Sequence, residues 1–525
     1  TAITTGSENT AVGYNALSAE DTGVGNVAIG RNALTTLNYA GTGYNTAVGY
    51  IAGSSVTTGI QNTLIGSLAG DALTDADRNT AVGYQSLTAD TLGSRSTALG
   101  FNALATQNFT SATDSYNVAV GYAAGNNLAT GVENTIIGGL AGDALTTGRE
   151  NTAVGLASLG GDTQGKKSVA VGWGTLTNQN FTSATDAHNT AVGYSAGNDI
   201  TTGIDNSILG SSAGDALTDA DYNTAIGAFA LTTDTLGSKS TAIGRGALYT
   251  QNFTSATDSF NTAVGINAGL AVTTGTSNTI IGGLAGSVFT TGLRNTLVGA
   301  NSGIALATSN SDNTFMGQGA GAAITSGDAN TIIGRYSGNA GGLDIRTSSN
   351  NTVLSDGDGN PRLIINSSGN VMVGTTSDAG YKLNLYSANS VMQSAVLNTA
   401  ARTHIAFNNG SAVGSITTSG SATAYNTSSD YRLKENVVTD WDATTRLKQL
   451  KPSRFNFIAD ADTTVDGFLA HEVQAIIPEA IHGTKDAVDA DGNAVMQGID
   501  QSKLVPLLVK TIQELEARIT ALEGE

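Results

Sequence analysis

Residues 79–95 read NTAVGYQSLTADTLGSR, and the first five residues of this stretch return, with small changes, along most of the chain. Copies of the motif begin at residues 9, 26, 45, 62, 79, 96, 117, 134, 151, 168, 189, 206, 223, 240, 261, 278, 295, 313, 330 and 351. The most common interval between two starts is the one between 62 and 79. The longest interval is the one between 96 and 117, and it recurs later in the array. A nearly fixed period of this length indicates a stacked repeat architecture.

The copies group into a longer unit of four coils. The starts at 45, 117, 189 and 261 are evenly spaced, because three short intervals are followed each time by one longer interval. The first three units end in the same sequence, FTSATD, at 109–114, 181–186 and 253–258. Each longer coil therefore carries an extra loop, and the loops are expected about 19 Å apart along a stack of strands.

The amino-acid preference at each position of the motif predicts a β-solenoid. The fourth position is aliphatic or Met, the fifth is Gly in 19 of 20 copies, and the eighth is small in all copies but the last. A short β-forming run that Gly stops is not a helix. A single coil cannot bury its apolar face, so the coils stack on one another. We expect residues 9–354 to form about twenty coils and a rod of roughly 90–100 Å.

Side-chain alternation along each strand assigns the faces of the coil. We expect the fourth-position side chains to point inward, so that Val192→Asp would bury an unpaired charge and unfold local coils. The third position then faces outward, yet it carries apolar residues such as Leu64, Ile136 and Ile280. Burial of that face against other copies of the chain would explain why it is apolar.

Composition excludes several classes of protein. The chain has 525 residues with 67 Gly but only 4 Pro, which excludes collagen. It has no Cys, so neither disulfides nor thiolate metal sites hold it together. The net charge of −19 argues against a nucleic-acid partner, and no apolar run is long enough for membrane insertion. No cofactor is expected, and an upstream segment is expected before Thr1.

The extra loops and the acidic turns are the ligand-binding candidates of the array. Each loop places an aromatic residue, Phe109, Phe181 or Phe253, among Ser, Thr and Asn. Either these loops contact a receptor, or the Phe side chains cover the flank of a coil or a subunit seam. The acidic turns at 71–77 and 215–221 lack the spaced carboxylates and the bidentate Glu of a calcium loop. They are interpreted as solvated turns, and no metal site is expected.

The chain divides into three parts. Residues 1–354 are the repeat array, and residues 355–429 are a junction or stalk in which short β-forming runs recur. From residue 430 charged residues become much more frequent, because 430–525 contains 10 of the 24 Lys and Arg and 17 of the 43 Asp and Glu. The last part is therefore expected to be a separate α+β domain.

Two resemblances follow from these residues. The array resembles the β-roll of trimeric autotransporter adhesin heads and related repeats of phage tail fibres, which implies three parallel chains. Ser428–Asn436, followed by the segments 447–457, 467–481 and 503–522, resembles the intramolecular chaperone auto-processing domain of phage tail fibres and tailspikes. His471 is a departure, because that family commonly has Gln there, and cleavage is not expected to depend on it.

The second resemblance implies a self-cleaving serine endopeptidase that acts once and on no other substrate. It assigns Ser429 as nucleophile and Lys434 as general base, with the cut in the junction Ser428-Ser429-Asp430. A Ser hydroxyl needs a base to accept its proton, and burial favours the uncharged Lys that this requires. The resemblance leaves open which bond of this junction is cut. A helix-capping Ser beside a surface Lys is the structural alternative.

A heptad pattern ends the chain. Apolar residues occur at gaps of three and four, at positions 505, 508, 512, 515, 519 and 522. This spacing suits a short coiled coil, and an ordinary amphipathic helix packed on the chaperone core is the competing interpretation.

Together these features predict a homotrimeric fibre of a phage or phage-like particle, located on the virion or an extracellular surface. It would contact a host receptor, a glycan or a surface protein, and join other tail proteins through the upstream segment. The alternative is a bacterial surface adhesin, although an autotransporter should end in a membrane β-barrel segment. A chain-hydrolysing tailspike is disfavoured, because it would need facing carboxylates in a cleft and the array offers none. An ice-binding solenoid is also disfavoured, because it would need a flat, regular Thr face and these coils vary and carry loops.

Overall fold

The structure is a computed structural model that describes residues 4–380, 382–385, 402–409, 411–419, 421–489 and 492–524. It divides into two compact units, Thr1–Met392 and Gln393–Glu525. Residues 386–401 of the expected stalk lie outside the described residues. The finer division at 354 and 429 stays a prediction, and each compact unit is described by itself.

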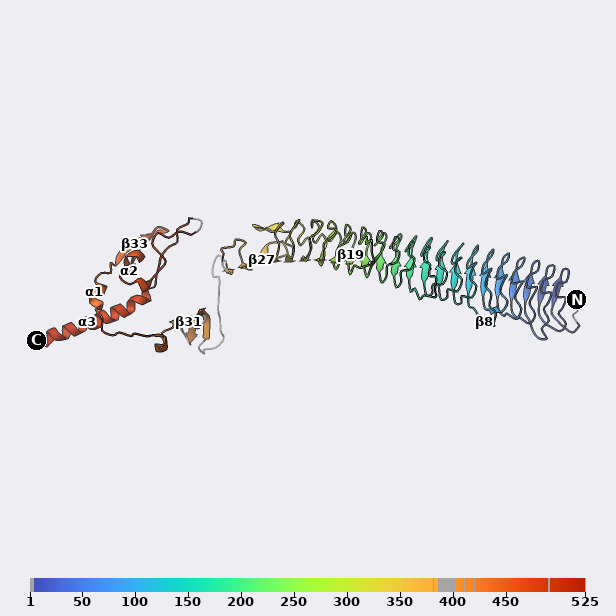
Figure 1. Ribbon diagram of the computed structural model, residues 1–525, viewed down its shortest axis with the longest axis horizontal. Helices are drawn as coiled ribbons and strands as arrows, with labels where there is room; N and C mark the ends of the chain where they lie inside the picture. The colour runs from blue at the N-terminus through green and yellow to red at the C-terminus, as the bar shows by residue number, and fades with distance from the viewer. Residues whose placement is uncertain are drawn as a thin grey trace. The chain divides into compact units, whose positions relative to one another are not determined.

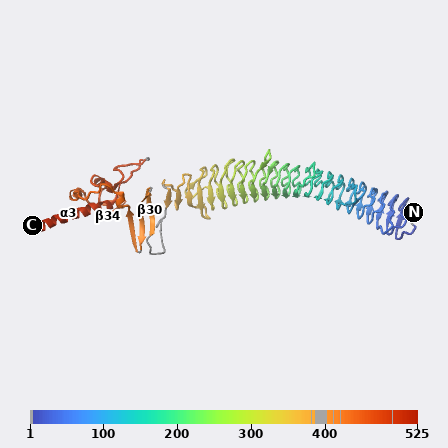
Figure 2. The same cartoon turned by 60° about the horizontal axis from the view of Figure 1, so that its bottom comes forward.

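The first unit is a solenoid in which one short strand per coil pairs with the same strand of the next coil (Figure 1). These strands are β1 (Thr10–Val12), β2 (Val27–Ile29), β3 (Thr46–Val48), β4 (Thr63–Ile65), β5 (Thr80–Val82), β7 (Thr97–Leu99), β9 (Val118–Val120), β10 (Thr135–Ile137), β11 (Thr152–Val154), β12 (Val169–Val171), β13 (Thr190–Val192), β14 (Ser207–Leu209), β15 (Thr224–Ile226), β17 (Thr241–Ile243), β19 (Thr262–Val264), β20 (Thr279–Ile281), β21 (Thr296–Val298), β22 (Thr314–Met316), β23 (Thr331–Ile333) and β26 (Thr352–Ser355). Figure 2 shows that this unit bows gently along its length.

All these strands pair in parallel and in register, so equal positions of the repeat stack on one another; Ala81 pairs with Ala98 and Val82 with Leu99. Gly at the fifth position ends each strand for a steric reason. Gly83 has φ +137°, and a Cβ atom there would lie 2.3 Å from the carbonyl oxygen of Gly100 in the next coil. Only Gly tolerates both the conformation and the contact. The predicted parallel β-solenoid of about twenty coils is confirmed.

The assignment of the two strand faces was wrong. The third-position side chains fill the interior, where Leu64, Ala191 and Ile280 are fully buried. The fourth-position side chains point outward, and Leu209 is 50% exposed. Val192→Asp would therefore not place a charge inside the coil, and an apolar third position is no evidence for contacts between chains.

The interior is filled by complementary residues at the ninth and twelfth positions. Leu at the ninth position is fully buried in four of the first six coils, as at Leu17 and Leu87. Where the ninth residue is Gly, as at Gly53 and Gly70, a Leu at the third or twelfth position occupies the space. A Cβ atom on Gly70 would lie 2.8 Å from Leu64 Cδ2 and from Leu73 Cδ1. The narrow interior is full, which explains why Ala suffices at many third positions.

A ladder of buried Asn side chains at the first position of the motif ties each coil together. Asn45 Oδ1 accepts a hydrogen bond from the backbone N–H of Asn62, at 3.0 Å. Asn62 Nδ2 donates across its own coil to the carbonyl oxygen of Ala76, at 2.8 Å. The same two bonds recur along the array, so the ladder satisfies backbone groups that would otherwise be buried without partners.

The loops of the longer coils pair locally with the preceding coil. Parallel pairs join β6 (Gly93–Ser94) to β8 (Thr113–Asp114) and β16 (Gly237–Ser238) to β18 (Thr257–Asp258). The side chains of Phe109, Phe181 and Phe253 are only 5–6% exposed. A Cβ atom on Gly93 would lie 2.7 Å from the ring of Phe109, so the rings cover the flank of the coil.

The solenoid ends in a small mixed cap of strands. β26 pairs with β27 (Pro361–Ile365), β27 pairs with β28 (Val371–Val373), and β28 pairs in parallel with β29 (Leu383–Leu385). A further hairpin joins β24 (Asn339–Ala340) to β25 (Leu343–Asp344). Strands β27 and β28 are two of the short β-forming runs expected in residues 355–429.

The second unit contains a meander and a small α+β core. Its elements are β30 (Arg402–Asn409), β31 (Ser411–Ser419), β32 (Ala422–Thr427), η1 (Tyr431–Leu433), α1 (Ala443–Leu447), β33 (Ser453–Phe457), β34 (Asp460–Gly467), α2 (Ala470–Gln474), η2 (Pro478–Ala480), β35 (Ile481–His482), β36 (Gly498–Ile499), η3 (Gln501–Leu504) and α3 (Val505–Glu523). The core is small and consists of Ala443, Val473, Ile477, Ala480, Leu504 and Leu507.

Helix α3 uses one face for this core and leaves its heptad face open. Leu507 and Thr511 are its buried residues, and Glu514 accepts hydrogen bonds from the backbone N–H groups of Ala443 and Thr444, both at 2.8 Å. The heptad side chains are exposed, and Ile512 is 63% exposed. The heptad stripe therefore does not pack on the core. Among the described helices, none has the length and apolar character of a membrane span.

Candidate self-processing site

The candidate cleavage junction directly follows the meander. Strand β32 ends at Thr427, and the backbone N–H of Ser428 still donates to the carbonyl oxygen of Val413 in β31, at 3.1 Å. The sheet therefore fixes the chain up to Ser428. The segment that follows leaves the sheet, which places Ser429 at the point where regular strand pairing ends.

A single 3-10 turn holds the residues after the junction. Asp430 caps η1 by accepting from the backbone N–H of Arg432, at 2.9 Å, and it also forms an ion pair with the Arg432 guanidinium, at 2.8 Å. The hydrogen bonds from Arg432 lower the pKa of the Asp430 carboxyl. Asp430 is thus a turn-forming carboxylate that remains ionised.

This turn brings Lys434 back to Ser429. Lys434 Nζ lies 2.8 Å from Ser429 Oγ. The backbone N–H of Lys434 donates to the carbonyl oxygen of Tyr431, at 3.1 Å, which fixes where the side chain starts. The cap and turn at Asp430 explain why the two side chains meet although they are not adjacent in the sequence. Both residues are exposed in the single chain.

Several apolar side chains close to the pair in the sequence are exposed in the single chain. Tyr425 and Tyr431 are each 80% exposed, and Leu433, Val437 and Val438 are also mostly exposed. Exposed apolar residues that lie close together on a surface are a feature of interaction sites.

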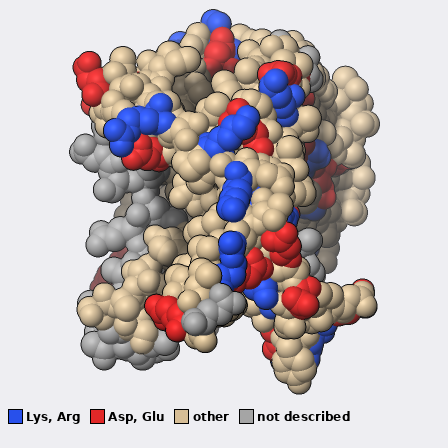
Figure 3. Space-filling view, turned by 90° about the vertical axis from the view of Figure 1, so that its left-hand side faces the viewer, with Lys and Arg blue, Asp and Glu red and all other residues tan. Residues whose placement is uncertain are grey.

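Several charged side chains in this part of the chain pair with one another. Figure 3 views the molecule from the left-hand side of Figure 1 and shows Lys and Arg next to Asp and Glu. Arg446 pairs with Glu479 and Arg454 with Asp466 in this way.

The comparison with protein families concerns this part of the chain. Residues 429–482 match the family model described as chaperone of endosialidase. The match begins at Ser429, includes Lys434 and extends to β35. Together with the solenoid, it fits a tail fibre or tailspike with a C-terminal chaperone domain, and this peptidase family implies intramolecular autocleavage. No curated protein and no solved structure matches the chain.

The other candidate site residues lie in the solenoid. The rings of Phe109, Phe181 and Phe253 are buried in the single chain. The polar residues that follow each ring are exposed, as at Thr110 and Ser111. The acidic turns engage neighbouring coils, since Asp77 Oδ1 accepts from the backbone N–H of Ile60 at 2.8 Å. No group of three candidate metal ligands occurs among the described residues.

A buried polar network was missed in the sequence. Asp90 and Gln107 occupy the same twelfth position in successive coils, where half of the coils carry an aliphatic residue, and both are fully buried. Equivalent pairs are Asp162 with Gln179 and Asp234 with Gln251. The sequence carried a signal, because the three coils that contain these Gln residues start with Ser instead of Asn.

Proposed function

We propose that this chain forms a homotrimeric fibre of a phage or phage-like particle, and that its chaperone domain promotes assembly and is then removed by self-cleavage. The observation that carries the proposal is the 2.8 Å contact between Ser429 Oγ and Lys434 Nζ at the start of the family match. The same contact is the least expected feature if Ser429 only caps a turn, because Asp430 already performs that role.

Ser429 and Lys434 have the roles of nucleophile and general base in this proposal. Lys434 accepts the hydroxyl proton as Ser429 Oγ attacks a backbone carbonyl carbon at the junction. The peptide C–N bond breaks as the proton is delivered to the leaving amide nitrogen, and water then hydrolyses the resulting ester to a carboxylate. Attack on the Ser428 carbonyl would cut the chain between Ser428 and Ser429. The family resemblance instead implies a cut beside the Ser429-Asp430 pair, so the exact bond is left open.

Assembly supplies the condition for this chemistry. A Lys that acts as a base must lose its charge, and burial favours the uncharged form. Lys434 is exposed in the single chain, and so are its sequence neighbours Tyr431, Leu433 and Val437. Two further copies of the chain would provide that cover. Cleavage would then follow trimer formation, and loss of the chaperone would make the fibre kinetically stable.

The outer face of the solenoid supports a parallel trimer. The fourth-position side chains form one continuous outward row, with exposed residues such as Ile65, Leu99, Leu209 and Met316. An apolar row along a whole rod exceeds the patches that monomers usually expose. The exposed heptad stripe of α3 offers a second surface of the same kind. Three parallel chains would bury both.

Host attachment is the adhesive part of the proposal. The loops at 110–114, 182–186 and 254–258 repeat every four coils and present exposed hydroxyl groups, which suits contact with a glycan or a surface protein. A bacterial surface adhesin remains the second candidate, because the repeat array serves both. Either location is outside the cytoplasm, on a virion or an extracellular surface.

The test of the proposal is a time course of freshly expressed full-length protein. The wild-type chain should convert to two products whose masses identify the bond, while Ser429→Ala and Lys434→Ala stay full-length and still trimerise. Ser428→Ala is the matched control if the cut lies beside Ser429-Asp430. Processing of the Ser429→Ala or Lys434→Ala variant at the wild-type rate would show that the dyad assignment is wrong.

A further inference from the structure

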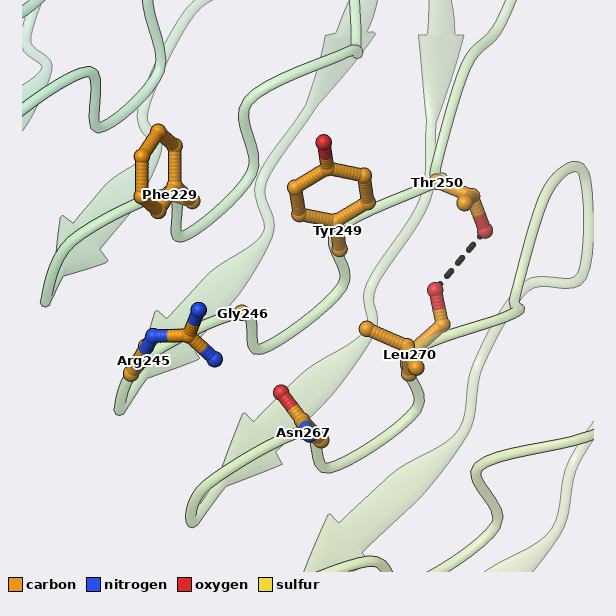
Figure 4. Close-up of a pocket in the computed structure, with 7 residues that line it drawn as sticks. All are labelled: Phe229, Arg245, Gly246, Tyr249, Thr250, Asn267 and Leu270. Carbon is orange, nitrogen blue, oxygen red and sulfur yellow. Dashed lines mark hydrogen bonds between the residues drawn. The ribbon is translucent and has the colours of Figure 1, made fainter.

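The coils of β15, β17 and β19 depart from the sequence pattern of the two preceding units. Three successive coils, those of β15, β17 and β19, line a hollow of about 500 Å³ (Figure 4). Phe229, Arg245 and Asn267 follow the ends of these three strands, and Tyr249 lies farther along the middle turn. Because the neighbouring units repeat almost the same sequence, they show what the array looks like without the hollow.

The residues equivalent to Arg245 in the two preceding units are aromatic. They are Trp173, one unit earlier, and Phe101, two units earlier. Trp173 stacks on Tyr194 at 4.8 Å, and Phe101 stacks between Tyr84 and Tyr122 at 5.4 Å from each. Stacked rings therefore occupy the sixth position of the motif in these coils of the earlier units.

In the third unit the aromatic residues lie at other positions of the motif than the sixth. Ala228 and Ile266 flank Arg245 where the earlier units have larger or aromatic residues. Phe229 and Tyr249 supply the rings instead, and their centroids lie 6.5 Å apart in an edge-to-face arrangement. Figure 4 shows the rings of Phe229 and Tyr249 and the Arg245 guanidinium lining the same hollow. The substitutions exchange a closed ring stack for an open hollow with a cation in it.

The Arg245 guanidinium is not neutralised by the chain. In the part of the chain that the structure describes, it forms no ion pair and no side-chain hydrogen bond. Other Arg residues of the array do form ion pairs, such as Arg95 with Asp114 and Arg294 with Asp312. An unpaired guanidinium leaves its planar donors available, and these donors suit bidentate binding of a carboxylate or a phosphate.

The walls of the hollow are fixed before any ligand arrives. Thr250 Oγ1 donates to the carbonyl oxygen of Leu270, at 2.8 Å, and the backbone N–H of Asn267 donates to the carbonyl oxygen of Arg245, at 2.9 Å. Gly246 has φ +65°, and a Cβ atom there would lie 2.6 Å from Asn267 Oδ1. Phe229 and Tyr249 remain 39% and 38% exposed, so their faces are available for contact. A preformed site loses less entropy on binding.

We propose that this hollow binds an acidic sugar unit of a glycan, one that carries a carboxylate or a phosphate. The anion would pair with Arg245, the C–H face of the sugar ring would pack on Tyr249 or Phe229, and a hydroxyl would bond to Asn267. Apolar walls with a few directed polar groups are typical of small-ligand sites. The inference deepens the proposed adhesive function and relies on it only for the biological setting.

The test uses purified full-length protein on an array of glycans that end in neutral, carboxylate-bearing or phosphate-bearing sugars. The wild type should prefer acidic glycans, and the preferred acidic arm identifies the anion. Arg245→Gln should weaken this binding at least tenfold, and Arg245→Phe, which restores the residue of the first unit, should do the same without loss of fold. Arg31→Gln is the matched control, because Arg31 has the same repeat position but lies over the Tyr50 ring.

The outcomes separate this site from the proposed fibre function. No preference for acidic glycans, retained binding in Arg245→Gln, or an equal loss in Arg31→Gln would each overturn the acidic-sugar site. Attachment of the fibre to cells and self-cleavage are measured independently. A chain that binds acidic glycans through Arg245 but fails to attach to any cell surface would contradict the adhesive function and leave the site standing.

Discussion

Gln107 Nε2 donates to the buried carboxylate of Asp90 in the preceding coil, with 2.6 Å between Nε2 and Oδ2. The same nitrogen donates to Ser96 Oγ at 2.8 Å, and Gln107 Oε1 accepts from Asn117 Nδ2 at 2.9 Å. The other oxygen of Asp90 accepts from the backbone N–H groups of Gly93 and Phe109. This network fills the place where Ser96 interrupts the Asn ladder and fastens the start of the extra loop.

Replacing Gln107 by Leu should therefore loosen the coil and its loop together. The change leaves Asp90 buried without its side-chain donor, a loss of about 2–3 kcal/mol in the local free energy of opening. Hydrogen exchange of the amides between residues 90 and 117 measures this effect. Gln61→Leu is the control, because Gln61 is exposed and should leave exchange unchanged. Equal protection in both variants would contradict the role of the network.

Neighbouring residues of strand β13 should respond oppositely to the same substitution. Ala191 is fully buried in the coil, so Ala191→Asp places an unpaired charge there and should cost about 3–5 kcal/mol of local stability. Val192 faces outward, so Val192→Asp should keep the coil folded and weaken association of the chains. Circular dichroism reports the first effect and light scattering the second. A monomeric mass of 52.8 kDa for the wild type would rule out the trimer.

The solenoid should become more stable as the solution is made mildly acidic. Burial raises the carboxyl pKa of six Asp residues: Asp71, Asp90, Asp143, Asp215, Asp221 and Asp234. The folded chain then binds protons more tightly than the unfolded chain, whose Asp pKa is about 3.9, so unfolding releases protons. Stability should rise as the pH falls through the raised pKa values toward about 4.

Thermal unfolding of the full chain between about pH 7 and pH 4.5 measures this dependence. The Asp90→Asn, Asp234→Asn double variant should show a smaller rise, because it lacks two of the six carboxyls. Asp344, whose pKa is lowered by hydrogen bonds from Arg346, supplies the control, since Asp344→Asn should not reduce the rise over this interval. A melting temperature that falls steadily on acidification of the wild type would contradict the prediction.

Helix α3 should control cleavage without touching the dyad. Ile512 is 63% exposed on the heptad stripe, so Ile512→Asp should leave the small core intact and prevent the helices of three chains from associating. Self-processing should then slow by at least tenfold, because Lys434 stays exposed to water. Gel analysis follows processing, and Lys510→Asp, a change at a position off the stripe, is the comparison. Wild-type processing by a monomeric Ile512→Asp chain would separate cleavage from assembly.

The period of the motif predicted the solenoid because period and Gly placement are local properties. A Gly whose Cβ would collide with the next coil, as at Gly83, leaves a direct trace in the sequence. The face assignment failed because alternation defines two faces but not which one is inside. The most uniformly aliphatic position was assumed to be the core, whereas the interior is filled by Leu17 and its equivalents together with the Asn ladder.

The pairing of Ser429 with Lys434 was expected from resemblance alone, and its geometry depends on the Asp430 cap that spacing does not reveal. The Arg245 hollow was not foreseen, although Arg245 stands where two earlier units have Trp173 and Phe101. Such a departure becomes meaningful only when the structure shows which residues of three coils meet. The burial of Phe109 likewise depends on its packing against Gly93, a contact that the loop sequence does not contain.

Successive four-coil units are joined by equivalent hydrogen bonds, so the array can gain or lose whole units during evolution. The coil that starts at Ser96 meets Asn117 through the same bonds with which the coil at Ser240 meets Asn261. Recombination between near-identical stretches of the gene can therefore delete residues 117–188, or copy them, and leave every joint of the rod matched. Each event would change the reach of the molecule by about 19 Å, while both ends stay as they are.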